Sequence, residues 1–284
     1  MSINIKNCSL ICKQGSGNFN EDIVGNSPHG IWVLDGATGL NNKNLVSKES
    51  DAKWYVSWWN EYLHKNLNRK DTLEDIVVEG IDKIYKDYME LINNQEVKSI
   101  DFPSASCAIM KFNEDKIEYL IMGDCKIFIE NKNNIEIIQD SKISKLDEIV
   151  CNIIKDIKDG QNLTLKEKKD KVMDMLINNR LKKNTENGYW SLEFSKEAGR
   201  KCLKGEIPLE DDMKIMITSD GFSCACDKYN ICKSEAMIEM AENKGIDYIY
   251  KKVRELESLD ERANKYPRFK INDDSSCIYL EVYK

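Results

Sequence analysis

Five short acidic motifs place carboxylates at the ends of apolar runs that are typical of β-strands. They are NED (20–22), VLDGATG (33–39), MGDCKIF (122–128), TSDGF (218–222) and NDDSSCIYL (272–280). One such motif alone is adequately explained as a strand-end turn that begins with aspartate. An isolated carboxylate at a buried edge loses hydration, however, and needs a cation to compensate it. Because the pattern recurs, we expect these strand ends to meet at one rim of a sheet-based core.

The chemistry that such a rim supports is the binding of a hard metal ion. Carboxylates held close together repel one another and raise one another's pKa unless cations neutralise them. Oxygen ligands favour Mg²⁺ or Mn²⁺ over zinc or copper, and the chain contains only two histidines. The small residues that follow Asp35, starting with Gly36, let a backbone carbonyl approach an ion closely.

Composition argues against several classes of protein. The 284 residues allow one large domain or two small ones. With 49 acidic and 42 basic residues, the net charge is −7, which disfavours nucleic-acid binding. No apolar run approaches membrane-spanning length and no N-terminal signal is visible, so we expect a cytoplasmic protein that does not bind membranes.

The ten cysteines are expected to be reduced thiols rather than a disulfide framework. A zinc site built from Cys224, Cys226 and Cys232 is the alternative. It is disfavoured, because the spacing is not Cys-x-x-Cys and no histidine is near.

Hydrophobic periodicity predicts a mixture of strands and helices. Helices are expected at about 47–68 and 71–92, the second with Asp71 as its N-cap, and a strand is expected in NGYWSLEF (187–194). Residues 141–186 are interpreted as an insertion of two polar helices. Two helices follow the first strands and two precede the last strand, so helix pairs could cover the outer faces of two packed sheets.

The five motifs, in this order and at this approximate spacing, resemble those of the metal-dependent protein phosphatase family, type 2C. GYWSLEF and the YPRFK segment ahead of NDD resemble the bacterial members in particular. The resemblance covers nearly the whole chain and implies an α+β fold, a four-layer α-β-β-α sandwich of two antiparallel sheets flanked by helix pairs. It also implies a single phosphatase domain over residues 1–284, with the helical insertion at about 141–186.

The resemblance assigns the main catalytic role to three aspartates. Asp35 would bridge two ions, Mg²⁺ or Mn²⁺, and the Gly36 carbonyl would bind one of them. Asp220 and Asp273 would complete the shell of the other ion, and Asp274 would support the site from behind.

The remaining acidic motifs are assigned to the outer parts of the same centre. Glu21 and Asp22 match the acidic pair that meets the first ion, directly or through water. Asp124 matches the position that helps some relatives to hold a third, weaker ion.

The activity that the resemblance implies is hydrolysis of phosphoserine and phosphothreonine in proteins by a water that bridges the two ions. The partners would be a phosphoprotein substrate and a cognate Ser/Thr kinase. The arginine that the family places ahead of NED is absent, so Lys13 and Arg268 are the candidates for binding the substrate phosphate. The alternative is a catalytically weak or inactive relative that binds a phosphoprotein or a kinase without turnover.

Overall fold

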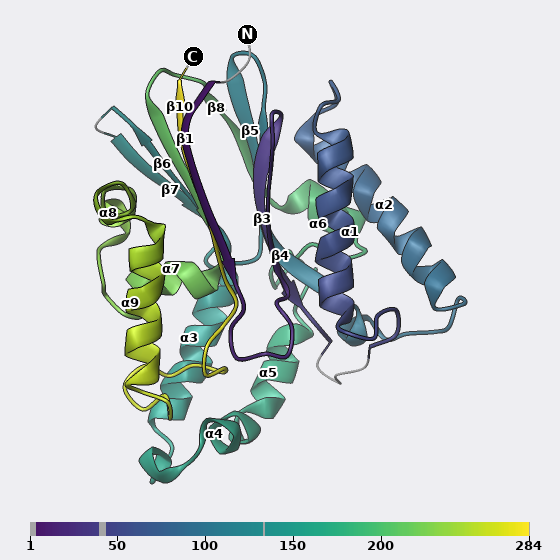
Figure 1. Cartoon of the computed structure of the whole chain (residues 1–284). Coiled ribbons are helices and arrows are strands. Elements are labelled where there is room, and N and C mark those ends of the chain that lie inside the picture. The colour runs from purple at the N-terminus through teal and green to yellow at the C-terminus, as the bar shows by residue number, and fades with distance from the viewer. Residues whose placement is uncertain (1–3, 40–43, 133, 284) are drawn as a thin grey trace.

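Two five-stranded antiparallel sheets packed face to face form the centre of the chain (Figure 1). The computed structural model describes residues 4–39, 44–132 and 134–283. The first sheet has the strand order β1 (Asn4–Lys13), β10 (Ser275–Tyr283), β9 (Met213–Thr218), β6 (Lys126–Asn131) and β7 (Asn134–Gln139). The second has the order β2 (Asp22–Ser27), β3 (Gly30–Ala37), β4 (Ser104–Phe112), β5 (Lys116–Met122) and β8 (Leu203–Pro208).

The second sheet is buried on both faces, which explains the continuous apolar run in β3. Trp32 and Leu34 belong to the core beneath the helices, whereas Ile31 and Val33 belong to the core between the sheets. Successive side chains of a strand point to opposite faces, so both sets of positions must be apolar.

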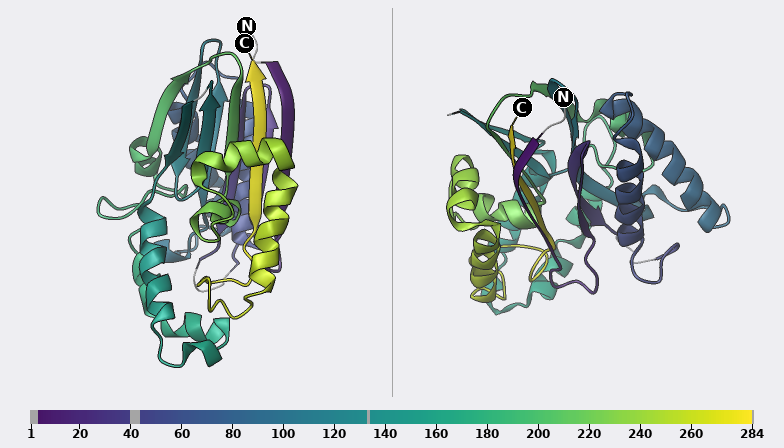
Figure 2. Two further views of the ribbon diagram at one scale, coloured as in Figure 1. Left: turned by 90° about the vertical axis from the view of Figure 1, so that its left-hand side faces the viewer. Right: turned by 45° about the horizontal axis from the view of Figure 1, so that its top comes forward.

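Helices cover the outer face of each sheet, as Figures 1 and 2 show. Those on the second sheet are α1 (Asp51–Asn66), α2 (Leu73–Leu91) and the short α6 (Lys196–Lys201). Those on the first sheet are α7 (Asp220–Asp227), α8 (Met237–Lys244) and α9 (Ile246–Ser258). The arrangement confirms the predicted four-layer α-β-β-α sandwich.

The start of α2 lies one residue later than predicted. Thr72 is the N-cap, and its hydroxyl accepts a hydrogen bond from the Asp75 amide at 3.1 Å. Asp71 pairs instead with Arg69, with 2.8 Å between carboxylate and guanidinium. Threonine and aspartate both favour the N-cap position, so residue type alone did not separate the two choices.

Residues 141–186 contain three helices rather than two: α3 (Lys142–Lys155), α4 (Leu165–Lys171) and α5 (Met173–Arg180). They lie at the end of the sandwich that carries the turn between β1 and β2 (Figures 1 and 2). Their own buried core is small and consists of Val150, Ile154 and Val172. That this segment is an insertion into a single domain stays a prediction.

The prediction of a strand in NGYWSLEF is wrong. Only isolated bridges occur there, from Leu192 to Ala105 and from Tyr189 to Lys183. The edge of the second sheet is instead β8, which pairs with β5. No helix in the described part of the chain is both long enough and apolar enough to cross a membrane.

Candidate metal centre

The acidic motifs meet at one end of the sandwich, because each lies within two residues of a strand end at the same rim. Asp22 opens β2 directly opposite Asp35 in β3. Asp124 lies in the turn between β5 and β6, and Asp220 follows β9 as the first residue of α7. Asp273 and Asp274 precede β10, whose first residue pairs with the last residue of β1.

Four of these side chains, which we call the inner carboxylates, are Asp22, Asp35, Asp124 and Asp220. Burial raises the pKa of each of them above its ordinary value. For Asp35 the nearby charges of Asp22, Asp220, Asp124 and Asp273 raise the pKa further. The pKa of Asp220 is raised to about 7, first by burial and then by Asp124 and Asp273. The inner carboxylates therefore lie close enough to repel one another.

One atom of this group is a buried acceptor without a well-oriented donor. Asp22 is only 3% exposed, and its Oδ2 has no hydrogen bond of good geometry from any described residue. The Ser276 hydroxyl is near enough to lower the pKa of Asp22, but burial outweighs it. A buried carboxylate oxygen in this state is costly unless a cation compensates it. Within residues 4–39, 44–132 and 134–283, no group of three or more His, Cys, Asp or Glu side chains is arranged to hold a metal ion. The donor set nevertheless fits Mg²⁺ or Mn²⁺, because it consists of carboxylate oxygens at a strand-end rim.

Asp273 and Asp274, which we call the outer pair, are held by hydrogen bonds, Asp274 through both of its oxygens and Asp273 through Oδ1. Asp274 accepts from the Gly15 amide at 2.7 Å through Oδ1 and from the Glu21 amide at 2.8 Å through Oδ2. Asp273 Oδ1 accepts from Lys270 Nζ at 2.5 Å and from the Asp274 amide at 3.0 Å. Asp274 thus ties the β1–β2 turn to the start of β10.

Glu21 is held by Gly36 of β3 and by two hydroxyls, those of Thr38 just after β3 and of Ser50 at the N-cap of α1. Glu21 Oε1 accepts hydrogen bonds from the hydroxyls of Thr38, at 2.7 Å, and of Ser50. The Gly36 amide donates to the Glu21 carbonyl at 3.0 Å. A Cβ atom at Gly36 would lie 2.6 Å from that carbonyl oxygen, so only glycine fits.

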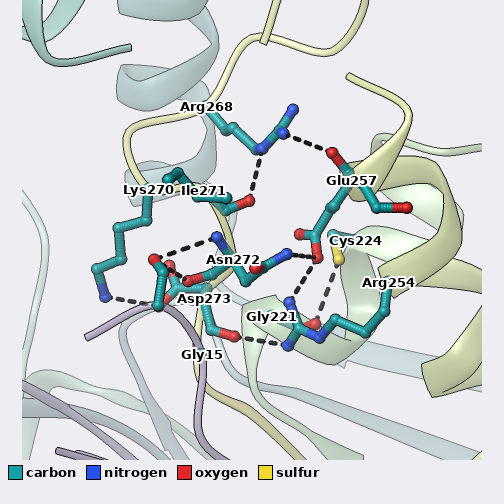
Figure 3. A network of polar contacts seen from close by, with 12 residues as sticks. Gly15, Gly221, Cys224, Arg254, Glu257, Arg268, Lys270, Ile271, Asn272 and Asp273 are labelled. Atoms are coloured by element: carbon teal, nitrogen blue, oxygen red, sulfur yellow. Dashed lines mark hydrogen bonds and ion pairs between the residues drawn. The ribbon is translucent and has the colours of Figure 1, made fainter. Parts of the chain in front are cut away.

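A network of polar contacts holds the backbone of the outer pair from the side of α9 (Figure 3). Arg254 donates to the Asp273 carbonyl at 2.6 Å and pairs with Glu257 at 2.5 Å. Asn272 donates to the same Glu257 carboxylate at 2.7 Å. The segment ahead of β10 is therefore fixed on both sides of Asp273.

Arg268 is not available for a substrate phosphate, contrary to the prediction. Its side chain is 5% exposed, and its guanidinium pairs with Asp260 at 3.3 Å. The same group donates to backbone carbonyls of Glu257, Asp260, Tyr266 and Ile271. Figure 3 shows Arg268 directed away from Lys270 and toward Ile271 and Glu257. Lys13, the other predicted candidate, is exposed at the end of β1.

Two residues of the polar segment reach the site and were not predicted. Burial and the charges of Asp220 and Asp273 raise the pKa of Asp147, in α3, to about 7. Arg180, at the end of α5, donates through Nη2 to the carbonyls of Ala37 at 3.3 Å and Thr38 at 3.1 Å. A signal existed for Arg180, since it is the one arginine in the lysine-rich stretch 141–186.

A cleft of about 480 Å³ opens beside the outer pair. Its walls include Glu21, Thr38, Ser50, Lys270, Asp273 and Asp274. Lys270 lies at the rim with its side chain 48% exposed. The cleft is thus lined by the outer pair and Glu21, and not by the inner carboxylates.

Comparison with known proteins places the fold among phosphatases. No protein-family model matches the sequence, and no curated protein matches it in sequence. Two structures of the serine/threonine phosphatase PstP are similar in fold. The Mycobacterium tuberculosis PstP/Ppp structure has a TM-score of 0.59 at 12% identity, over 100% of both chains. The PstP catalytic domain in complex with two manganese ions has a TM-score of 0.56 at 13% identity, over 98% of both chains.

A third similar structure is the serine/threonine phosphatase Stp1 from Staphylococcus aureus. Its TM-score is 0.55 at 13% identity, over 100% of this chain and 97% of that chain. At such identities the likeness establishes the fold alone, which this chain shares with bacterial serine/threonine phosphatases.

Proposed function

We propose that this chain is a metal-dependent phosphatase that hydrolyses phosphoserine and phosphothreonine in proteins. The observation that carries the proposal is the convergence of the inner carboxylates, with an Asp22 Oδ2 that lacks a well-oriented donor, at one rim of a phosphatase fold. The PstP structure with two manganese ions supports a two-ion centre by similarity.

The ions would be Mg²⁺ or Mn²⁺, held by Asp35 as the bridging ligand together with the Gly36 carbonyl, Asp220 and Asp273. Glu21 and Asp22 would complete the side nearest β2. A third, weaker ion would bind at Asp124, where Asp147 of α3 is a further acidic neighbour. When bound, such ions activate water near neutral pH and stabilise charge on the phosphoryl oxygens.

The chain's own cations would position the phosphate, and we assign the main contact to Arg180. Two carbonyls that closely follow Asp35 hold its Nη2 and so fix the plane of the guanidinium. Its Nε is buried and donates to no described residue, and Nη1 donates to none in the same part of the chain. Nη1 is therefore the donor left for a ligand, and a planar guanidinium held in this way suits a phosphate better than the flexible, exposed Lys13.

The partners under this proposal are a phosphoprotein substrate and a cognate Ser/Thr kinase, and the compartment is the cytoplasm. The test is hydrolysis of p-nitrophenyl phosphate and of a phosphothreonine peptide, with Mn²⁺ and after exhaustive chelation. We expect turnover only with the metal. Undiminished turnover without any metal would refute the proposal.

A second candidate function is binding of a phosphoprotein without turnover. It is favoured by one observation, the engagement of Glu21 Oε1 with the hydroxyls of Thr38 and Ser50, which leaves that oxygen less available to an ion. Metal-loaded protein that binds the phosphopeptide in calorimetry, yet releases no phosphate from it, would establish this alternative.

A further inference from the structure

Three sulfur atoms from separate elements converge near the C-terminal end of α7, the helix whose first residue is Asp220. Cys226 lies near the end of α7, Cys232 in the loop after it, and Met237 is the first residue of α8. Cys226 Sγ lies 3.3 Å from Cys232 Sγ and 3.9 Å from Met237 Sδ. Cys232 Sγ lies 4.0 Å from the same Sδ. We call this group the sulfur cluster.

Local backbone structure brings the cluster together. The chain reverses after α7, because the Tyr229 amide donates to the Cys224 carbonyl and the Ile231 amide to the Ala225 carbonyl. Asn230 adopts a left-handed conformation, with φ of 50°, which asparagine tolerates better than most residues. The reversal sets Cys232 back over Cys226.

Cys224 does not belong to the cluster, although it lies on the same helix. Its Sγ donates to the Gly221 carbonyl one turn earlier, at 3.3 Å. The combination of Cys224, Cys226 and Cys232 that the sequence suggested for zinc is therefore not assembled. A thioether takes the third place, and no sequence spacing signals it.

We propose that Cys226, Cys232 and Met237 form a binding site for one soft monovalent metal ion, Cu⁺. Thiolate and thioether sulfur are the ligands that select Cu⁺. Bonds of about 2.3 Å, the usual length for metal–thiolate bonds, put three trigonal sulfurs about 4 Å apart. The two separations that involve Met237 already have this length, and the two thiols need to open only slightly.

The surroundings suit capture of a soft ion from solution. Met237 is fully buried and Cys226 is 7% exposed, whereas Cys232 is partly exposed and offers the point of entry. Binding of Cu⁺ releases both thiol protons to solvent. Two Cys–SH groups, one Met thioether and one Cu⁺ give a complex of two thiolates and one thioether, together with two H⁺. The site is independent of the acidic rim, whose oxygen ligands disfavour Cu⁺.

The test is an anaerobic titration of the reduced full chain with Cu⁺ in competition with bathocuproine disulfonate. We expect wild type to bind one Cu⁺ in this cluster and Cys224→Ser, the matched control from the same helix, to behave alike. Met237→Leu should weaken binding by about tenfold or more, which corresponds to about 1.4 kcal/mol. X-ray absorption on wild type should show three sulfur neighbours. Unchanged affinity in Met237→Leu, or two sulfur neighbours only, would overturn the proposal.

A second measurement needs no substitution and therefore no assumption about folding. Alkylation with iodoacetamide, mapped by mass spectrometry, should show that Cu⁺ protects Cys232 and Cys226. The exposed Cys8 should stay reactive and serves as the internal control. If Cu⁺ leaves Cys232 fully reactive while peroxide joins it to Cys226 as a disulfide, the pair is a redox couple and the metal assignment is wrong.

Discussion

The inner carboxylates and the outer pair lie at one rim of one sandwich, yet their environments are opposite. Both oxygens of Asp274 accept backbone amides, and Asp273 pairs with Lys270. Asp22 and Asp35, by contrast, are raised in pKa by burial and by neighbouring carboxylates, and Asp22 keeps a buried oxygen without a well-oriented donor.

Asp274, with both oxygens bound to amides, builds the site, whereas the inner carboxylates await a cation. Asp273 lies between these two cases, because only its Oδ1 is bound by the described part of the protein. A carboxylate satisfied by amides contributes to stability whether or not a metal is present. A group of buried, mutually repelling carboxylates costs stability until cations arrive. The same residue type therefore predicts opposite responses to substitution on the two sides of the rim.

The largest effect is expected for Asp35→Asn. Loss of the central carboxylate should reduce turnover by more than about 1,000-fold, because under the proposed function it would remove a ligand shared by both ions. The same change should raise the thermal midpoint of the chain in EDTA, because it relieves repulsion among the inner carboxylates. Initial rates and melting curves on one preparation check both statements. Normal rates, or a lower midpoint in EDTA, would remove Asp35 from its proposed role.

Asp274→Ala should act in the opposite sense on stability. Two amides, those of Gly15 and Glu21, lose their charged acceptor, so the free energy of unfolding should fall by about 2–4 kcal/mol. Urea unfolding in EDTA measures this quantity, with Asp35→Asn as the matched comparison at the same rim. A variant as stable as wild type would contradict the inference that Asp274 stabilises the metal-free chain.

Arg180→Ala should change substrate binding without changing metal binding. We expect KM for a phosphopeptide to rise about tenfold, the effect of losing a charge-assisted contact of about 1.4 kcal/mol. Mn²⁺ affinity should stay as in wild type. Arg200→Ala, on the exposed side of α6, is the control. An equal KM in both variants would refute the assignment, and a loss of Mn²⁺ would show that Arg180 only supports the loop after Asp35.

The only effect that needs no substitution concerns pH and the metal-free chain. The pKa of Asp220 is about 7 in the folded state, against about 3.9 unfolded. The folded state therefore binds more protons in this window, and stability in EDTA should fall as pH rises from 5 to 7.5, by about 2.5 kcal/mol. The free energy of unfolding, measured with urea at each pH, should change less with pH in Asp220→Asn and in wild type with Mn²⁺. An equal change with pH in all three samples would contradict the electrostatic account.

The sequence predicted those features that depend on local pattern. Apolar alternation located most strands, and the position of Asp35 or Asp220 just beyond such a run placed it at the rim. The α2 cap was displaced by one residue because Asp71 and Thr72 are both good caps. NGYWSLEF has the composition of a strand, but it meets its neighbours only at isolated bridges.

The features that were not predicted depend on long-range packing. Arg268 has the right residue type for phosphate, but the loop before β10 encloses it. Arg180 reaches the rim only because α5 packs beside the loop after β3. Met237 joins two cysteines through a chain reversal that no spacing rule describes.

A crystal structure of the chain soaked with Mn²⁺, with anomalous diffraction data, tests directly whether two metal ions bind at the acidic rim. We expect two anomalous peaks at the rim, with Asp35 contacting both and the Asp22 carboxylate facing one of them. We also expect that Asp274 keeps its bonds to the Gly15 and Glu21 amides. Peaks elsewhere on the chain, or a rim without manganese under conditions that support turnover, would contradict it.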